Sequence, residues 1–201
     1  VGCLATLTPE QFADGCGEVV KHAVIADPEL FAELEKTPLT LELLNRDVAR
    51  VALIIARNID IKRAVVVADE RETNQRKLLN FGHSAGHAVE ACEHFELGHG
   101  NCVSIGMGII TRAAALHGIC DAELPGRIEE LCTRHGLKTR CNLNADAVFA
   151  EALHDKKRAG DTIDLVIPHD IGRCSIDRTP LSTFHDLIAE GLGQKGDASA
   201  C

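Results

Sequence analysis

The chain has 201 residues, a length that suits one domain, or one large domain with a small appendage. Its formal net charge of -9 argues against general binding to nucleic acid or anionic membranes, because both require a basic surface. Nine cysteines are scattered without a Cys-x-x-Cys pair, which favours reduced thiols in a cytoplasmic protein. No apolar run approaches a membrane span, and the absence of an initial Met suggests a piece of a longer protein.

Helical periodicity and helix-start signals account for most of the chain. Thr8-Pro9 and Asp27-Pro28 each combine a capping residue with proline at the first helical position. A long helical pattern then runs from Thr40 to about Asp69, and the three valines at 65–67 stay in it because no turn signal precedes them. Predicted helices begin near Thr8, cover 17–26, 28–35 and 40–69, begin again near Arg76, and cover 101–116, 121–135, 145–154 and 180–191.

One β-hairpin is the only other regular structure that the sequence predicts. Its strands are expected at 162–167 and 173–177, with Pro168 and Gly172 between them. Residues 192–201 are expected to form a disordered tail. The expected fold is therefore mainly α, a multihelical domain over residues 1–191 with one short β-hairpin.

The segment from Arg76 to Gly100 is the most unusual part of the sequence, because it holds four of the ten histidines. Read as one helix from Arg76, it places four polar side chains on one face, where a packed helix needs apolar ones. Gly82 and Gly86 in the same turns let another backbone or a ligand come close. The segment therefore predicts a buried ligand site, and Gly98 and Gly100 predict a turn around His99. The four polar side chains are Arg76, Asn80, His83 and His87.

Each candidate residue also has an ordinary interpretation. His83, His99 and a carboxylate could bind a metal through three ligands with an open position, yet histidines beside a loop are as often satisfied polar residues. Glu18 and Lys21 share a helical face at i and i+3, which is more often a surface ion pair. The basic run at 155–158 is more often a solvated turn than a phosphate site. Spacing alone does not decide between these interpretations.

The combination of motifs is more specific than any one of them. Together they resemble the C-terminal domain of 3-dehydroquinate synthase over about residues 8–178. The motifs are Gly17-Glu-Val-Val-Lys21, Lys62 to Glu70, Arg76-x-x-x-Asn80-Phe-Gly-His83-Ser-x-Gly-His87-Ala-x-Glu90, His99-Gly100 with Gly106-Met107, and Asp155-Lys-Lys157.

The resemblance implies a helical domain that carries Zn²⁺ or Co²⁺ and follows an α/β domain that holds NAD. No Gly-rich loop between a strand and a helix occurs in these 201 residues, so we expect the NAD-binding domain to be absent from this chain. The complete enzyme is expected to be a cytoplasmic homodimer. Its implied substrate is the sugar-acid phosphate 3-deoxy-D-arabino-heptulosonate 7-phosphate, and its products are 3-dehydroquinate and phosphate, in the shikimate pathway.

The resemblance also implies a role for each site residue. Glu18, His83 and His99 would be the metal ligands, and one carboxylate with two imidazoles suits Zn²⁺. His87 would relay a proton, while Lys21 and Arg76 would act beside it in catalysis. The substrate carboxylate and hydroxyls would contact Lys21, Lys62 and Arg76, and its phosphate would contact Asn80, His87 and Lys157 or Lys156.

Three alternatives remain open at the level of sequence. Other sugar-phosphate cyclases share the metal set but differ around the phosphate and carboxylate contacts. Iron-type alcohol dehydrogenases share the two-domain plan, yet they typically have Asp at the position of Glu18. A metal-stabilised helical interaction domain without enzymatic activity would not need the polar set of Lys21, Lys62, Arg76 and Asn80. The isolated chain, lacking a dinucleotide site, is expected to be inactive.

Overall fold

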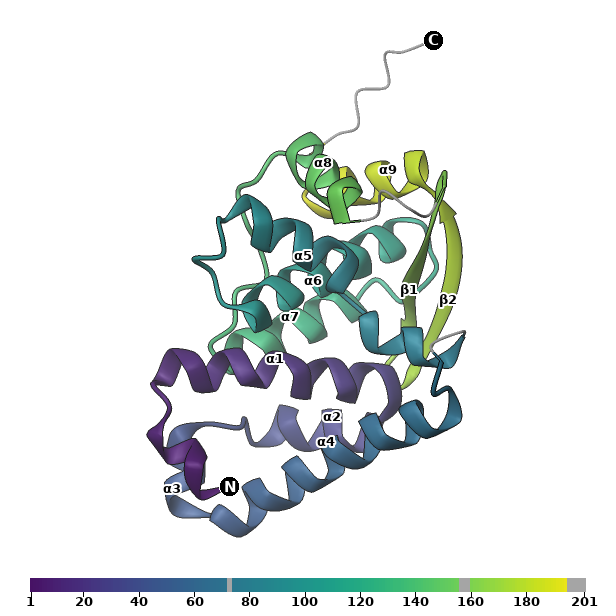
Figure 1. Cartoon of the computed structure of the whole chain (residues 1–201). Helices are drawn as coiled ribbons and strands as arrows, with labels where there is room; N and C mark the ends of the chain where they lie inside the picture. Colours follow the sequence, from purple (N-terminus) through teal and green to yellow (C-terminus); the bar gives the residue numbers. More distant parts are fainter. Residues whose placement is uncertain (72–73, 156–159, 195–201) are drawn as a thin grey trace.

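The computed structural model describes residues 1–71, 74–155 and 160–194 (Figure 1). As predicted, the fold is mainly α with a single hairpin among the described residues. Within this part of the chain, no helix combines the length and apolarity of a membrane span. The elements are the 3₁₀ helix η1 (Gly2–Thr6), α1 (Pro9–Ala26), α2 (Pro28–Lys36), α3 (Leu41–Arg46), α4 (Val48–Ala68), the 3₁₀ helix η2 (Gln75–Asn80), α5 (His83–Cys92), α6 (His99–Leu116), α7 (Leu124–Arg134), α8 (Ala145–Asp155), β1 (Thr162–Asp170), β2 (Arg173–Pro180) and α9 (Leu181–Gly191).

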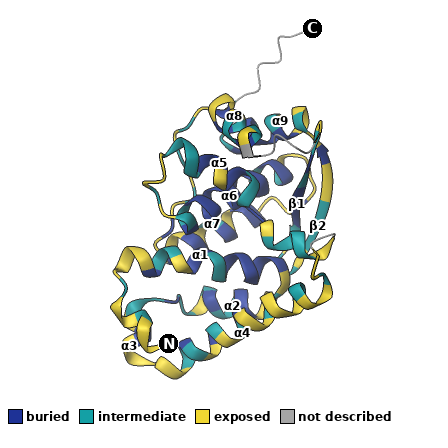
Figure 2. Ribbon diagram, viewed as in Figure 1, coloured by how far each residue is buried: buried dark blue, intermediate teal, exposed yellow. Residues whose placement is uncertain are grey.

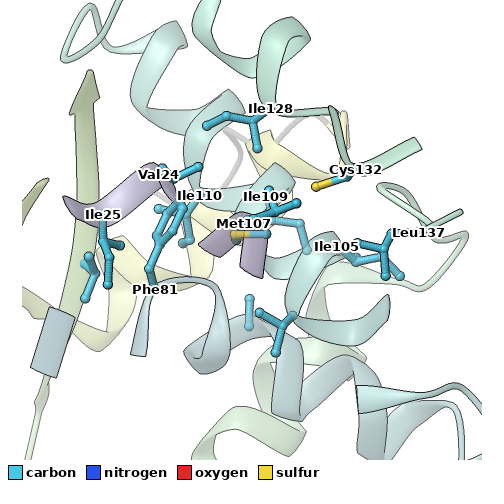
Figure 3. Close-up of a cluster of buried hydrophobic side chains, with 14 of the residues drawn as sticks. Val24, Ile25, Phe81, Ile105, Met107, Ile109, Ile110, Ile128, Cys132 and Leu137 are labelled. Atoms are coloured by element: carbon cyan, nitrogen blue, oxygen red, sulfur yellow. The ribbon is translucent and has the colours of Figure 1, made fainter. Parts of the chain in front are cut away.

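Helix α6 forms the centre of the domain. It contacts α1, α5, α7, α9 and β1, and most of its residues are buried (Figures 1 and 2). Figure 3 shows part of this core, in which Met107 and Ile109 of α6 lie among side chains such as Val24 of α1 and Ile128 of α7. A helix buried on all sides must be apolar or small on all sides. The buried helix that the sequence predicted over residues 101–116 is confirmed.

The first helix is continuous where two helices were expected. The Thr8 side chain accepts the Gln11 backbone N–H, and the Gln11 side chain accepts the Thr8 N–H, so α1 begins with a complete capping box. The separate start expected near Gly17 is wrong. Gly17 is buried inside α1, because its missing side chain allows the backbone of α6 to come close.

The helix expected over 40–69 is in fact two helices. Asp47 ends α3 with an extended φ of -143°, and its side chain then accepts the Arg50 N–H to begin α4. The sequence pattern missed this break because apolar residues continue on both sides of it. The assignment of the valines at 65–67 to a helix is confirmed, since α4 extends to Ala68.

The single helix expected from Arg76 is also wrong. Residues Gln75–Asn80 form η2, the chain then turns at Gly82, and α5 begins only at His83. Gly82 has a φ of 76°, which a residue with a side chain rarely adopts, and this conformation separates the two helices. His99 is likewise not in a turn, because it is the first residue of α6 and follows Gly98 as the N-cap.

The hairpin and the chain end complete the fold. β1 and β2 pair antiparallel from Thr162 opposite Pro180, with an irregularity in register between Pro168 and Asp170. The predicted hairpin is confirmed, but the expected place of Pro168 between the strands is wrong. The strands are longer than expected, so Pro168 lies inside β1 opposite Cys174, and Gly172 lies between the strands. Of the tail expected at 192–201, residues 195–201 lie outside the described residues. The Gln194 side chain accepts the Ala145 N–H and donates to the Leu143 carbonyl, so α8 begins against this end of the chain.

Buried His135 connects α7 to the segment before α3 and makes folding sensitive to pH. The Leu39 N–H donates to its Nε2 at 3.0 Å, and its Nδ1 lies 2.7 Å from the Leu131 carbonyl. Neutral imidazole satisfies both bonds, with the proton on Nδ1. Burial lowers the pKa of His135 below its usual value near 6.5.

We expect the free energy of unfolding to fall as the pH drops below about 6.5, because the unfolded state then binds a proton that folded His135 does not. This contribution is complete above the unfolded pKa and is lost as the pH falls through the folded pKa. Urea unfolding at several pH values between 7.5 and 5 measures it. His135→Gln should reduce the slope of the unfolding free energy against pH, to which the lowered pKa values of His22 and His83 also contribute, whereas exposed His94→Gln should not. Equal slopes for all three proteins would contradict this assignment.

Candidate metal and substrate site

Three helices meet where their backbones come unusually close. A Cβ on Gly17 of α1 would lie 2.7 Å from the Gly100 carbonyl oxygen of α6. A Cβ on Gly106 would lie 2.0 Å from the Gly82 carbonyl oxygen, directly before α5. Only glycine fits these positions without displacing backbone. The contacts bring the residue after Gly17, which is Glu18, toward the ends of α5 and α6 that carry histidines.

Three of the histidines form a cluster at these helix ends. One ring nitrogen from each of His83, His87 and His99 lies within 4.8 Å of the others. The ring centroid of His83 is 5.2 Å from that of His87 and 5.3 Å from that of His99. His83 and His87 lie one turn apart on α5, while His99 begins α6. The cluster therefore depends on the packing of two helices and not on one helical face.

Glu18 faces the cluster from α1. Its Oε2 accepts a hydrogen bond from the Lys21 ammonium at 2.7 Å, and its Oε1 lies 3.6 Å from Nε2 of His83. Oε1 is buried, and within the described structure it has no hydrogen-bond partner. An unsatisfied buried carboxylate oxygen is costly unless a cation completes its environment.

The electrostatics of the site favour the ligand forms of these side chains. Burial lowers the pKa of His83 to about 4, with the charge of Lys21 adding to the effect, so the imidazole is neutral at neutral pH. Burial alone would raise the pKa of Glu18, but the charge and hydrogen bond of Lys21 outweigh it and the pKa is lowered. An ionised Glu18 beside the neutral imidazole of His83 is a pair that can bind a divalent metal.

These residues fit the metal that the motifs imply. Two ligands of one tetrahedral zinc ion are about 3.3 Å apart, close to the separation of Glu18 from His83. Outer contacts orient the imidazoles: Nδ1 of His83 lies 3.2 Å from the Phe81 carbonyl, and Nδ1 of His99 lies 3.3 Å from Oε2 of Glu90. Such second contacts direct the remaining ring nitrogen to a metal. The histidine cluster also contains His87, so geometry offers two ligand sets.

A polar cleft adjoins the metal candidates. Its cavity volume is about 230 Å³, and it collects residues from α1, α4, η2 and α5. Lys21 is only 2% exposed, and burial lowers its pKa even though Glu18 opposes this. Such a buried ammonium beside other cations favours an anionic ligand. The lining residues are Glu18, Lys21, His22, Lys62, Arg76, Leu79, Asn80 and His83.

The structure thus brings together most of the residues expected from the sequence. His87 lines a second cavity of about 280 Å³ between α5 and α8, with Ser84, Glu90 and His154 among its walls. Lys156 and Lys157, the two candidates for a phosphate contact, lie outside the described residues.

Sequence reasoning missed the contribution of His22. Its Nδ1 lies 2.5 Å from Oδ1 of Asn58 on α4, and the pair braces α1 beside the cleft. The sequence signal that could have indicated a role for His22 at the cleft was its position directly after Lys21.

Solved structures share this arrangement of helices. The chain aligns with ValA, the 2-epi-5-epi-valiolone synthase from Streptomyces hygroscopicus subsp. jinggangensis 5008 with NAD+ and Zn2+ bound, at a TM-score of 0.82 and 24% identity. That alignment covers 95% of this chain and 52% of ValA. A 2-deoxy-scyllo-inosose synthase complexed with carbaglucose-6-phosphate, NAD+ and Co2+ aligns with a TM-score of 0.74 and 20% identity, over 94% of this chain and 54% of the other. This chain therefore has the fold of about half of each of these two proteins.

Sequence comparison shows the family of the chain. Residues 15–158 match the family model described as 3-dehydroquinate synthase C-terminal, so the chain belongs to that family. It is 38% identical over 187 residues to 3-dehydroquinate synthase of Streptococcus suis (strain 05ZYH33), covering 92% of this chain and 52% of the relative. It is 37% identical over 202 residues to that of Acetivibrio thermocellus (strain ATCC 27405), covering 98% and 54%. The chain spans about half the length of these curated relatives.

Proposed function

We propose that this chain is the metal- and substrate-binding half of a 3-dehydroquinate synthase, a lyase that converts 3-deoxy-D-arabino-heptulosonate 7-phosphate to 3-dehydroquinate and phosphate. The observation that carries the proposal is the cleft, in which buried Lys21 lies with Lys62 and Arg76 beside the unsatisfied oxygen of Glu18. A seven-carbon acid phosphate presents a carboxylate, hydroxyls and a phosphate to these cations. The family membership of the chain supports the same reaction.

Each polar group in the cleft has a binding task in this proposal. The planar guanidinium of Arg76 pairs with the two oxygens of the substrate carboxylate. Lys21 and Lys62 hold hydroxyl oxygens, and Lys21 also keeps Glu18 oriented through their 2.7 Å hydrogen bond. The phosphate contacts Asn80 and His87, together with a lysine at 156 or 157.

Glu18, His83 and His99 would hold Zn²⁺ or Co²⁺, and the NAD-binding half would close over the cleft. When bound, the metal supplies a Lewis acid and NAD supplies a reversible hydride acceptor. His87 lies one turn after His83 on α5. In the proposed reaction it relays the proton lost from C6, the carbon next to the C5 hydroxyl carbon, as phosphate leaves C7. The remaining side chains position the substrate for ring opening and closure.

Replacing Arg76 by Lys should separate substrate binding from metal binding. In the complete enzyme we expect kcat/KM to fall roughly 10- to 100-fold, because an ammonium cannot form the two parallel charge-assisted bonds of a guanidinium. Metal content and thermal unfolding should stay at the wild-type level. Steady-state kinetics with elemental analysis make the comparison, and parallel loss of metal and activity would place Arg76 at the metal instead.

The proposed reaction is tested by comparing this chain with the complete two-domain enzyme. This chain with substrate, Zn²⁺ and NAD should release no phosphate above background, whereas the complete two-domain enzyme should release phosphate and form 3-dehydroquinate. Metal binding by the isolated chain, measured by titration, shows that its half of the site is folded in the same preparation. Turnover by the isolated chain at the rate of the complete enzyme would refute the division of labour proposed here.

A second candidate is a sugar-phosphate cyclase that acts on a different sugar phosphate. The structural similarity to ValA, with a TM-score of 0.82, supports this second candidate. The substrates of the two candidates differ in one group, a carboxylate, which an enzyme acting on a sugar phosphate without a carboxylate does not need to bind. Offering the complete enzyme one sugar phosphate with a carboxylate and one without it separates the two candidates, since the cleft that contains Arg76 should favour the substrate with the carboxylate.

A further inference from the structure

Asp69 lies at the junction between α4 and η2, the two elements that bring Lys62, Arg76 and Asn80 to the cleft. It is the C-cap residue of α4, and its backbone N–H donates to the Val65 carbonyl. Its side-chain Oδ2 accepts the backbone N–H of Asn74 at 2.6 Å and that of Arg76 at 3.1 Å. One carboxylate oxygen thus holds the first turn of η2 against the end of α4.

The Arg76 side chain continues this attachment. Its guanidinium donates to the carbonyl oxygen of Glu70, the residue after Asp69, at 2.9 Å. The backbone and the side chain of Arg76 are therefore both fixed to the two residues that follow α4. Because Lys62 lies about two turns earlier on the same helix, this junction sets the distance between two cations of the cleft.

We propose that Asp69 is a positioning residue for substrate binding: its carboxylate sets where η2 begins and thereby aims Arg76 into the cleft. The inference rests on the proposed function, in which Arg76 binds the substrate carboxylate. Asp69 itself does not line the cleft, so it acts through Arg76 and not by touching substrate. A carboxylate at the amino end of a short helix that accepts two backbone N–H groups makes two charge-assisted hydrogen bonds and interacts favourably with the helix dipole.

A second carboxylate that contacts η2, but comes from β1, provides a matched control. Asp164 of β1 accepts from the Lys77 ammonium at 2.6 Å, and the two side chains are 36% and 30% exposed. A partly exposed ion pair between flexible side chains contributes little. Both carboxylates contact adjacent residues of η2, but only Asp69 holds its backbone.

The first arm of the test measures hydrogen exchange of backbone amides in this chain. In Asp69→Ala, the amides of Asn74 and Arg76 should exchange roughly 10- to 100-fold faster, the range expected when charge-assisted hydrogen bonds are lost. Asp69→Asn keeps an accepting oxygen and should recover much of the protection. Asp164→Asn should leave both amides unchanged. Unaltered exchange in Asp69→Ala would overturn the proposal.

The second arm measures kinetics and metal content of the complete enzyme. Asp69→Ala should raise KM for the acid phosphate roughly tenfold or more with wild-type metal content, and Asp69→Asn should restore most of the loss. Loss of metal, or faster amide exchange with unchanged KM, would mean that Asp69 is merely structural and would overturn the proposal. Inactivity of the unmodified enzyme would refute the proposed function instead, while the exchange rates would still decide whether Asp69 holds η2.

Discussion

Replacing His83 or His99 by Ala is expected to weaken Zn²⁺ binding by this chain by more than the roughly 10- to 100-fold that loss of an outer contact costs. In the proposed site with three protein ligands, each substitution removes one imidazole ligand, and two ligands hold zinc poorly. His94→Ala is the matched control, because His94 is an exposed histidine outside the cluster. Titration of chelator-treated protein with Zn²⁺ measures all three, and equal affinities would contradict the assignment.

The same titration decides which third side chain is a ligand. The proposed set contains Glu18, whose Oε1 is buried and unsatisfied within the described structure, whereas the histidine cluster contains His87. We expect Glu18→Gln to weaken Zn²⁺ binding strongly, because an amide oxygen lacks the charge of a carboxylate. His87→Ala should retain the metal and lose activity in the complete enzyme. The reverse pattern would assign the third ligand to His87 and leave proton relay to another group.

Two glycines on α1 should respond in opposite directions to the same substitution. Gly15 is exposed with nothing within 4 Å of an added Cβ, so Gly15→Ala should raise the free energy of unfolding by about 0.5 to 1 kcal/mol. Gly17→Ala places its Cβ 2.7 Å from the Gly100 carbonyl oxygen. The helices must separate, at a net cost of roughly 1–3 kcal/mol that exceeds the gain in helix propensity.

This separation should also reach the metal site. Glu18 follows Gly17, and His99 precedes Gly100, so moving α1 away from α6 withdraws a carboxylate from the imidazoles. We expect Gly17→Ala to weaken Zn²⁺ binding and Gly15→Ala to leave it unchanged. Chemical denaturation and zinc titration of the two variants provide the measurements. Stabilisation by Gly17→Ala would show that α1 and α6 are less closely packed than described.

Local signals in the sequence predicted most of the secondary structure. The Thr8 capping box, the Asp27-Pro28 start and the turn residues between the strands act over a few neighbouring residues, so a pattern is sufficient to detect them. The break at Asp47 escaped because the same apolar spacing continues across it, and only the cap bond to Arg50 reveals a new helix. The turn at Gly82 escaped because glycine in a sequence does not report the sign of its φ.

The sequence by itself determined the helical class and, through the order of its motifs, the residue types available to the site. Only the tertiary structure decided how these residues meet. Arg76 and Asn80 do not share a helix with His83, and they reach the cleft because η2 is held at the end of α4. Glu18 reaches His83 because glycines allow α1, α5 and α6 to approach closely. Contacts between helices depend on packing across long sequence separations, and the periodicity of a single helix carries no information about its neighbours.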